Sequence, residues 1–268
     1  MSARTGKPST RPRLSIIVPT YDESENAAEL IRRTDAALSG VEAELLFVDD
    51  GTDDLPAVAA TSGLGTALNV RTLRRAAPAG GLSSAVVEGI RNARARVCVV
   101  MDGDLQHPPE LIRSLWDRYQ QGGLDVVAAS RYAPGGDATG LAGPSRALVS
   151  RLSTVLARAL FPLRLRGVTD PMTGFFLLDT AGLDLEELRP RGFKILLEIL
   201  VRRQRRVAKI PLVFADRSAG YSKASARQGL HFLGQLWSLR AGAMVPFRAR
   251  ACERLAAVEA ARTEPRRA

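Results

Sequence analysis

Acidic side chains that could bind a cation stand at three places in the sequence, each shortly after a run of apolar residues. They are Asp22 and Glu23 after 14–18, Asp49 and Asp50 after 44–48, and Asp102 and Asp104 after 97–101. Carboxylates gathered at one edge of a sheet repel each other unless a cation or a donor-rich ligand lies among them. The pattern therefore favours a charged ligand bound where these runs end.

The third cluster has the spacing of a metal site. Asp102 and Asp104 are two residues apart, so an extended segment points both side chains to the same side, and Gln106 adds a neutral oxygen. Such an all-oxygen set suits Mg²⁺ or Mn²⁺ rather than zinc. An isolated Asp-x-Asp is more often a polar turn between a strand and a helix. The neighbouring acidic clusters favour the metal here.

Alternating strands and helices must position these residues. Strands are expected at 14–18, 44–48, 69–73, 97–101 and 125–129, with helices at 25–38, 55–61, 82–93 and 108–120 between them. This order predicts an α/β fold with a mainly parallel sheet, which binds ligands at the carboxyl ends of its strands. Further on, helices are expected at 144–160, 193–203 and 229–244, and strands at 175–178 and 207–214.

Composition excludes several classes of protein. The chain has 268 residues, of which 46% are apolar and 25% charged, as in an ordinary globular domain. Two cysteines and two histidines are too few for a Cys-rich zinc site or a disulfide scaffold. No apolar stretch reaches the roughly 20 residues of a membrane span. We expect a cytoplasmic protein, or one that is peripheral on the cytosolic face of a membrane.

The net charge of +10 is unevenly distributed. The stretches 1–13, 189–209 and 248–268 together carry +14, so the remainder of the chain is slightly acidic, at −4. Basic stretches of this kind favour an anionic partner, either lipid or nucleic acid. Because aromatic residues make up only 5% and the basic stretches lie away from the strand-end cluster, we expect no nucleic-acid partner.

Four segments are expected along the chain: a disordered basic leader at 1–12, a main domain at 13–225, an amphipathic helix at 226–247 and a basic tail at 248–268. The helix carries an apolar stripe of Leu230, Leu233, Trp237, Ala241 and Met244. Arginines flank the stripe, which predicts a helix lying in a membrane interface. Two alternatives remain: the helix packs on the domain core, or a partner protein supplies the membrane anchor.

A series of motifs resembles family-2 glycosyltransferases. The runs are Ile-Val-Pro-Thr-Tyr-Asp-Glu at 17–23, Val-Asp-Asp at 48–50, Gly-Leu-Ser-Ser-Ala-Val at 81–86 and Asp-Gly-Asp-Leu-Gln-His-Pro-Pro at 102–109. Ser-Arg-Tyr at 130–132, Asp-Pro-Met-Thr-Gly-Phe-Phe at 170–176, Gly-Phe-Lys-Ile at 192–195 and Arg-Ser-Ala-Gly-Tyr-Ser-Lys at 217–223 narrow the resemblance. Together they resemble the dolichol- and polyprenol-phosphate mannose synthases, from about residue 13 to 225.

This resemblance implies a GT-A fold, a divalent cation and transfer of a sugar from a nucleotide diphosphate to a polyprenyl phosphate with inversion. GDP-mannose is the favoured donor. UDP-glucose, a UDP-N-acetylhexosamine or a different acceptor is the alternative, since Asp22 and the run 51–54 depart from the family pattern beside the nucleoside pocket. A non-catalytic subunit is disfavoured by the intact metal motif.

The resemblance also assigns roles to residues. Those for the nucleotide sugar are Pro19, Tyr21, Glu23, Asp50, Asp102 and Asp104; those for the metal are Asp102, Asp104 and Gln106. Those for the acceptor phosphate are Arg131, Arg146, Ser150, Arg217 and Lys223. Asp104, Arg131 and Arg217 are expected nearest to the reacting atoms.

The residue types suit that chemistry. A phosphomonoester is already an anion at neutral pH, so it attacks without a general base. Arginine pairs phosphate oxygens bidentately and does not deprotonate, although any one arginine could instead be a surface charge. Arg146 and Ser150 are four residues apart on one predicted helix and face the same way. His107 precedes two prolines, so a structural role is favoured over a base.

Overall fold

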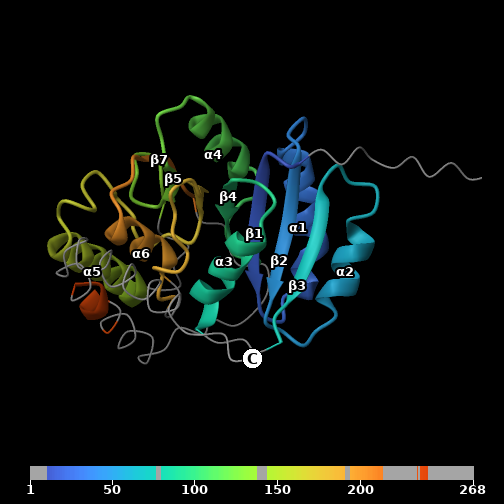
Figure 1. Cartoon of the computed structure of the whole chain (residues 1–268), viewed down its shortest axis with the longest axis horizontal. Helices are drawn as coiled ribbons and strands as arrows, with labels where there is room; N and C mark the ends of the chain where they lie inside the picture. The colour runs from blue at the N-terminus through green and yellow to red at the C-terminus, as the bar shows by residue number, and fades with distance from the viewer. Residues whose placement is uncertain are drawn as a thin grey trace, which may run out of the picture.

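The computed structural model describes residues 11–76, 80–137, 144–190, 194–213, 234 and 236–240, with the backbone alone at 144–150. A central sheet has helices on both faces (Figure 1). The fold therefore has the three layers expected of an α/β protein.

Within the described residues, seven strands form the sheet. In spatial order they are β3 (Asn69–Arg74), β2 (Ala43–Asp49), β1 (Leu14–Thr20), β4 (Val97–Val100), β6 (Phe176–Asp179), β5 (Val126–Ser130) and β7 (Val207–Pro211). β6 is antiparallel to both of its neighbours, and the other pairings are parallel. As a result, the residues that precede β6 lie at the carboxyl edge of the parallel strands, where the acidic clusters are.

The helices divide between the two faces of the sheet. They are α1 (Ser24–Ala37), α2 (Leu55–Ser62), α3 (Gly81–Asn92), α4 (Leu111–Gln120), α5 (Pro144–Leu160) and α6 (Ile195–Arg202). Apolar residues of α1, α2 and α4 form one core with the sheet, and those of α3, α5 and α6 form the other. Alternate residues of β1 point to opposite faces of the sheet. Ile16 packs into the core with α1, α2 and α4, and Ile17 packs into the core with α3, α5 and α6.

Most predicted elements of the described residues are confirmed to within one or two residues, and three boundaries need a correction of two or three residues. β1 was expected to end before Pro19, but it continues to Thr20 through its pairing with β2. Its pairing with β4 ends at Ile17, so no hydrogen bond to β4 is lost because Pro19 lacks an N–H. Helix α4 begins at Leu111, so the two prolines lie in the turn before it. Strand β7 ends at Pro211.

The predicted C-terminal amphipathic helix is only partly described. Residues 236–240 are helical; Leu236 and Leu239 are buried in the core shared with α6, while Trp237 is 79% exposed. One side of this turn therefore packs on the domain and the other faces outward. Among the described residues, no helix combines the length and the apolar character needed to cross a membrane.

Candidate active site

The loop after β4 carries the predicted metal ligands. The Asp102 side chain is 36% exposed, whereas Asp104 is buried and accepts a hydrogen bond from the Gln106 N–H at 3.1 Å. Leu105 adopts a left-handed backbone (φ 61°), which tightens the turn between the two carboxylates and Gln106. The loop thus has one solvent-accessible carboxylate, that of Asp102. The other, that of Asp104, is held in place by a hydrogen bond within the loop.

His107 holds this loop in place. Its Nδ1 accepts a hydrogen bond from the backbone N–H of Asp102 at 3.0 Å, and its ring stacks on Phe175 with centroids 5.0 Å apart. The residue is 2% exposed. Since Nδ1 is committed to the backbone, the structural role that the sequence favoured for His107 agrees with the geometry.

Two glycines let neighbouring segments close on the loop. A Cβ on Gly103 would lie 2.6 Å from a carboxylate oxygen of Glu23, and one on Gly174 would lie 3.3 Å from a carboxylate oxygen of Asp102. A side chain at Gly103 would therefore push the Glu23 carboxylate from its position. The ends of β1 and β4 and the segment before β6 converge here, so Glu23 lies beside Gly103, the residue next to Asp102.

The two aspartates at the end of β2 have different surroundings. Asp49 is buried and accepts hydrogen bonds from the Gly51 N–H (2.9 Å) and from Arg74 Nε (2.9 Å), so it stabilises the turn. Asp50 forms a bidentate ion pair with Arg75, whose Nη1 also donates to Ser84 Oγ at 2.8 Å. The predicted nucleoside residue Asp50 is thus accompanied by Arg75, a residue the sequence prediction missed.

Arg131, which follows β5, is fixed by a carboxylate that the prediction also missed. Its Nε and Nη2 donate to the two oxygens of Asp170 at 2.8 and 3.1 Å, and the two side chains are 8% and 0% exposed. Burial disfavours the charged form of Arg131, but hydrogen bonding and charge from Asp170 outweigh it and raise the pKa. A permanent, rigid cation therefore lies at the carboxyl edge.

Lys194 is a second cation at this point. Its Nζ donates to the Met172 carbonyl at 2.9 Å. Burial lowers the pKa of Lys194 to about 8; Arg131 lowers it further, while Asp170 and Asp102 act in the opposite direction. Both Asp170 and Lys194 lie within motifs that carried the family resemblance. Their place in these motifs is the feature of the sequence that could have identified them as site residues.

The remaining predicted residues are placed less completely. Pro19 is buried within β1, and Tyr21 beyond it is 55% exposed. Arg146 and Ser150 lie on α5, where the backbone alone is described; Arg217 and Lys223 lie outside the described residues.

The side chains of this loop would bind a metal ion only together with further ligands from water or a bound substrate. No three His, Cys, Asp or Glu side chains gather closely enough to hold a metal ion in the described part of the chain. The oxygen donors of Asp102, Asp104 and Gln106 nevertheless match Mg²⁺ or Mn²⁺, which usually take further ligands from water and substrate phosphates. The residues present therefore suit a cation that arrives with a diphosphate.

A cavity of about 1270 Å³ opens at the opposite edge of the sheet. It is lined by residues 40–43 and 63–70, with Arg11 and Arg94. These residues lie at the amino ends of β2 and β3, so the cavity is remote from the acidic clusters. The candidate active site is therefore located by the acidic and basic side chains at the carboxyl edge, and not by this cavity.

Comparisons with known proteins agree with this geometry. The family model described as glycosyl transferase family 2 matches residues 15–183. A dolichol-phosphate mannosyltransferase of Pyrococcus furiosus is 38% identical over 85% of this chain, and the chain covers 63% of that relative's length. The Saccharomyces cerevisiae dolichol-phosphate mannosyltransferase is 35% identical, with 84% of this chain and 86% of the yeast protein covered.

A further relative and a solved structure extend the comparison. The polyprenol monophosphomannose synthase of Mycolicibacterium smegmatis is 30% identical over 80% of this chain and 81% of its own. Glucosyl-3-phosphoglycerate synthase from Mycobacterium tuberculosis, crystallised with Mn²⁺, UDP and phosphoglyceric acid, shares the fold with a TM-score of 0.66 at 19% identity, over 88% of this chain and 80% of that chain. The predicted GT-A fold is thereby confirmed. The chain belongs to glycosyl transferase family 2.

Proposed function

We propose that the chain transfers mannose from GDP-mannose to the phosphate of a polyprenyl or dolichyl monophosphate, with inversion. The observation that carries the proposal is the Arg131–Asp170 pair beside Asp102. It sets a fixed, buried cation suited to an acceptor phosphate next to oxygen ligands suited to a metal-bound diphosphate. Relatives named dolichol-phosphate mannosyltransferase support the choice of mannose and of a polyprenyl phosphate.

On the donor side, Asp102, Asp104 and Gln106 would hold Mg²⁺ or Mn²⁺, and Pro19, Tyr21, Glu23 and Asp50 the nucleoside. A bound cation supplies charge neutralisation of the departing diphosphate. The fold neighbour crystallised with Mn²⁺ and UDP supports a divalent cation in such a site. Arg75, which pairs with Asp50, adds hydrogen-bond donors to the nucleoside pocket.

On the acceptor side, Arg131 would bind the phosphate, assisted by Arg146, Ser150, Arg217 and Lys223. Arg131 is held rigidly by Asp170, so little side-chain entropy is lost when the phosphate binds. The acceptor phosphate is itself the nucleophile, and no base is required. This agrees with His107, whose Nδ1 already accepts a backbone hydrogen bond.

An exposed apolar surface suits a lipid-borne acceptor. Leu152, Val155 and Leu163 are 58%, 64% and 82% exposed on α5 and the turn after it. Residues 144–169 contain five arginines and no acidic residue. Apolar side chains surrounded by basic ones favour binding to an anionic membrane surface. We propose that this face and Trp237 lie on the cytosolic surface of a membrane, where a partner protein could add an anchor.

Sedimentation with lipid vesicles tests the membrane proposal. Wild type is expected to sediment with phosphatidylglycerol vesicles much more than with phosphatidylcholine vesicles. Because a charge in the apolar face opposes insertion, the double variant Leu152→Glu, Val155→Glu should lose this binding. Full binding by the double variant would exclude α5 as the contact surface.

A transfer assay tests the chemistry. The purified chain is incubated with labelled GDP-mannose or UDP-glucose, with farnesyl phosphate or farnesol, and with Mn²⁺ or EDTA. We expect a labelled lipid only from GDP-mannose, farnesyl phosphate and Mn²⁺ together. Transfer from UDP-glucose alone would reassign the donor, and transfer to farnesol would contradict a phosphate acceptor.

A further inference from the structure

Lys194 reaches the carboxyl edge from a well-anchored backbone. It immediately precedes α6, whose next residues Ile195 and Leu196 are buried in the core. Its Nζ donates to the carbonyl of Met172 at 2.9 Å, on the segment between Asp170 and β6. The backbone of Lys194 and the far end of its side chain are thus both held, and the ammonium group is placed beside the Arg131–Asp170 pair.

The charges around this point favour an incoming anion. Arg131 and Lys194 contribute two positive charges; Asp170, which binds Arg131 through both of its oxygens, offsets one of them, so Lys194 supplies the net positive charge of this group. Asp102 acts on both cations from the end of β4, where the metal ligands are expected. Burial and the repulsion from Arg131 destabilise the ammonium form of Lys194, so a nearby anion would stabilise it.

We propose that Lys194 binds the acceptor phosphate together with Arg131; this assignment rests on the proposed function. A phosphate monoester carries close to two negative charges at neutral pH. Lys194 adds a fixed positive charge beside the Arg131–Asp170 pair, which is neutral overall. Arg131 supplies a planar, permanently charged fork, whereas Lys194 supplies a compact point charge. On the donor side the diphosphate is expected to bind Mg²⁺ or Mn²⁺. We therefore assign Lys194 to the acceptor phosphate.

Binding of farnesyl phosphate, measured by calorimetry without donor, tests this proposal on the full chain. Lys194→Met removes the charge. Lys194→Gln also removes the charge but keeps an N–H donor for the Met172 carbonyl, so a loss of binding in this variant is not explained by the loss of that hydrogen bond. Lys194→Arg keeps the charge. Lys209→Met, at an exposed position of β7, is the matched control. Thermal unfolding is recorded for every variant, and GDP binding with Mn²⁺ is measured in parallel.

We expect Lys194→Gln and Lys194→Met to weaken farnesyl phosphate binding by about 10- to 100-fold, the worth of one charge-assisted contact. Lys194→Arg should recover most of the affinity, and GDP binding and the Lys209→Met control should be unchanged. Wild-type affinity in Lys194→Gln, or an equal loss of GDP and farnesyl phosphate binding, would overturn the proposal. Absence of mannosyl transfer with these binding differences intact would refute the proposed function alone.

Discussion

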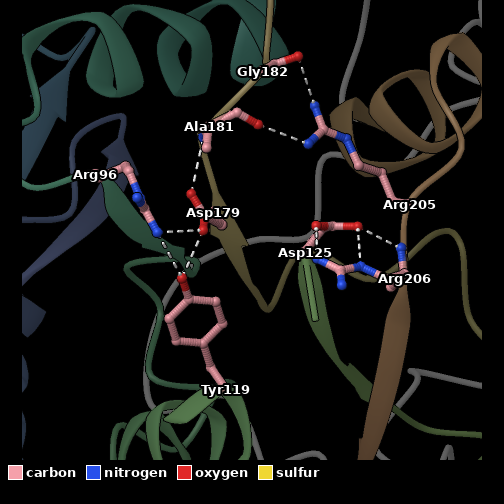
Figure 2. A network of polar contacts seen from close by, with 8 residues as sticks. All are labelled: Arg96, Tyr119, Asp125, Asp179, Ala181, Gly182, Arg205 and Arg206. Carbon is pink, nitrogen blue, oxygen red and sulfur yellow. Dashed lines mark hydrogen bonds and ion pairs between the residues drawn. The ribbon is translucent and has the colours of Figure 1, made fainter. Parts of the chain in front are cut away.

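The two edges of the sheet both carry arginine–aspartate pairs, but they differ in exposure to solvent. At the carboxyl edge the Arg131 and Asp170 side chains are 8% and 0% exposed. At the amino edge Arg206 pairs with Asp125 at 2.9 Å, and these side chains are 66% and 25% exposed (Figure 2). Exposed pairs contribute little to stability, whereas a buried pair must offset a large desolvation penalty. Because burying the Arg131–Asp170 pair costs free energy, we infer that its charges are kept for function and not for stability.

The amino-edge network connects chain segments. Arg96 and Tyr119 both donate to Asp179 at the end of β6, at 2.9 and 2.6 Å (Figure 2). Arg205 donates to the carbonyls of Ala181 and Gly182 just beyond it. These contacts tie α4, β4 and β6 to the segment before β7. We therefore assign this edge a structural role and the opposite edge a chemical one.

Breaking the buried pair should have the largest effect. Asp170→Asn leaves the Arg131 charge buried without its carboxylate, and we expect it to lower the free energy of unfolding by about 3–5 kcal/mol. Urea denaturation measures this change, with Asp125→Asn at the amino edge as the matched control. Equal destabilisation by the two variants would remove the distinction between the edges.

Removing a metal ligand should reduce activity while sparing the fold. We expect Asp104→Ala to lower the rate of mannosyl transfer by about 10²–10³-fold, the range seen when one group that stabilises the transition state is lost. The rate is measured at saturating GDP-mannose and Mn²⁺, with the far-ultraviolet circular dichroism spectrum as a check on folding. A rate close to that of wild type would argue against this loop as the metal site.

Alkaline pH should weaken the acceptor site through Lys194, whose pKa is lowered to about 8 by burial and by Arg131, with Asp170 and Asp102 opposing. Because the ammonium form is lost above that pH, farnesyl phosphate affinity should fall by up to about tenfold by pH 9. Stability should move the other way. An unfolded lysine keeps its proton to about pH 10.4, so between these values the lysine's contribution favours the folded state increasingly. Calorimetric titrations at pH 7 to 9.5 should show the fall in affinity in wild type but not in Lys194→Arg.

The smallest effect is expected at the amino edge. Hydrogen bonding from Arg206 lowers the pKa of Asp125, so its contribution to stability is present above about pH 4, the ordinary value, and is lost as the pH falls through the lowered pKa. Asp125→Asn should therefore destabilise slightly at pH 7 and not at all in strong acid, with mannosyl transfer unchanged. A large loss of transfer in this variant would mean that the amino edge influences the chemistry.

The sequence predicted the first half of the fold well because strands buried on both faces are mostly apolar along their length, as at 14–18 and 44–48. It did not predict that β6 is antiparallel, since a local pattern carries no strand direction. Asp170 and Lys194 were missed as site residues for a related reason. Asp170 meets Arg131 from 39 residues away, and only the fold creates that contact.

Binding of GDP to the full chain tests the central claim most directly, because it does not depend on the identity of the acceptor. Wild type and Asp125→Asn should bind GDP with Mn²⁺ and lose it in EDTA, and Asp102→Asn should bind it weakly under both conditions. Binding that ignores both Mn²⁺ and the substitution at Asp102 would contradict a metal–diphosphate site at the carboxyl edge.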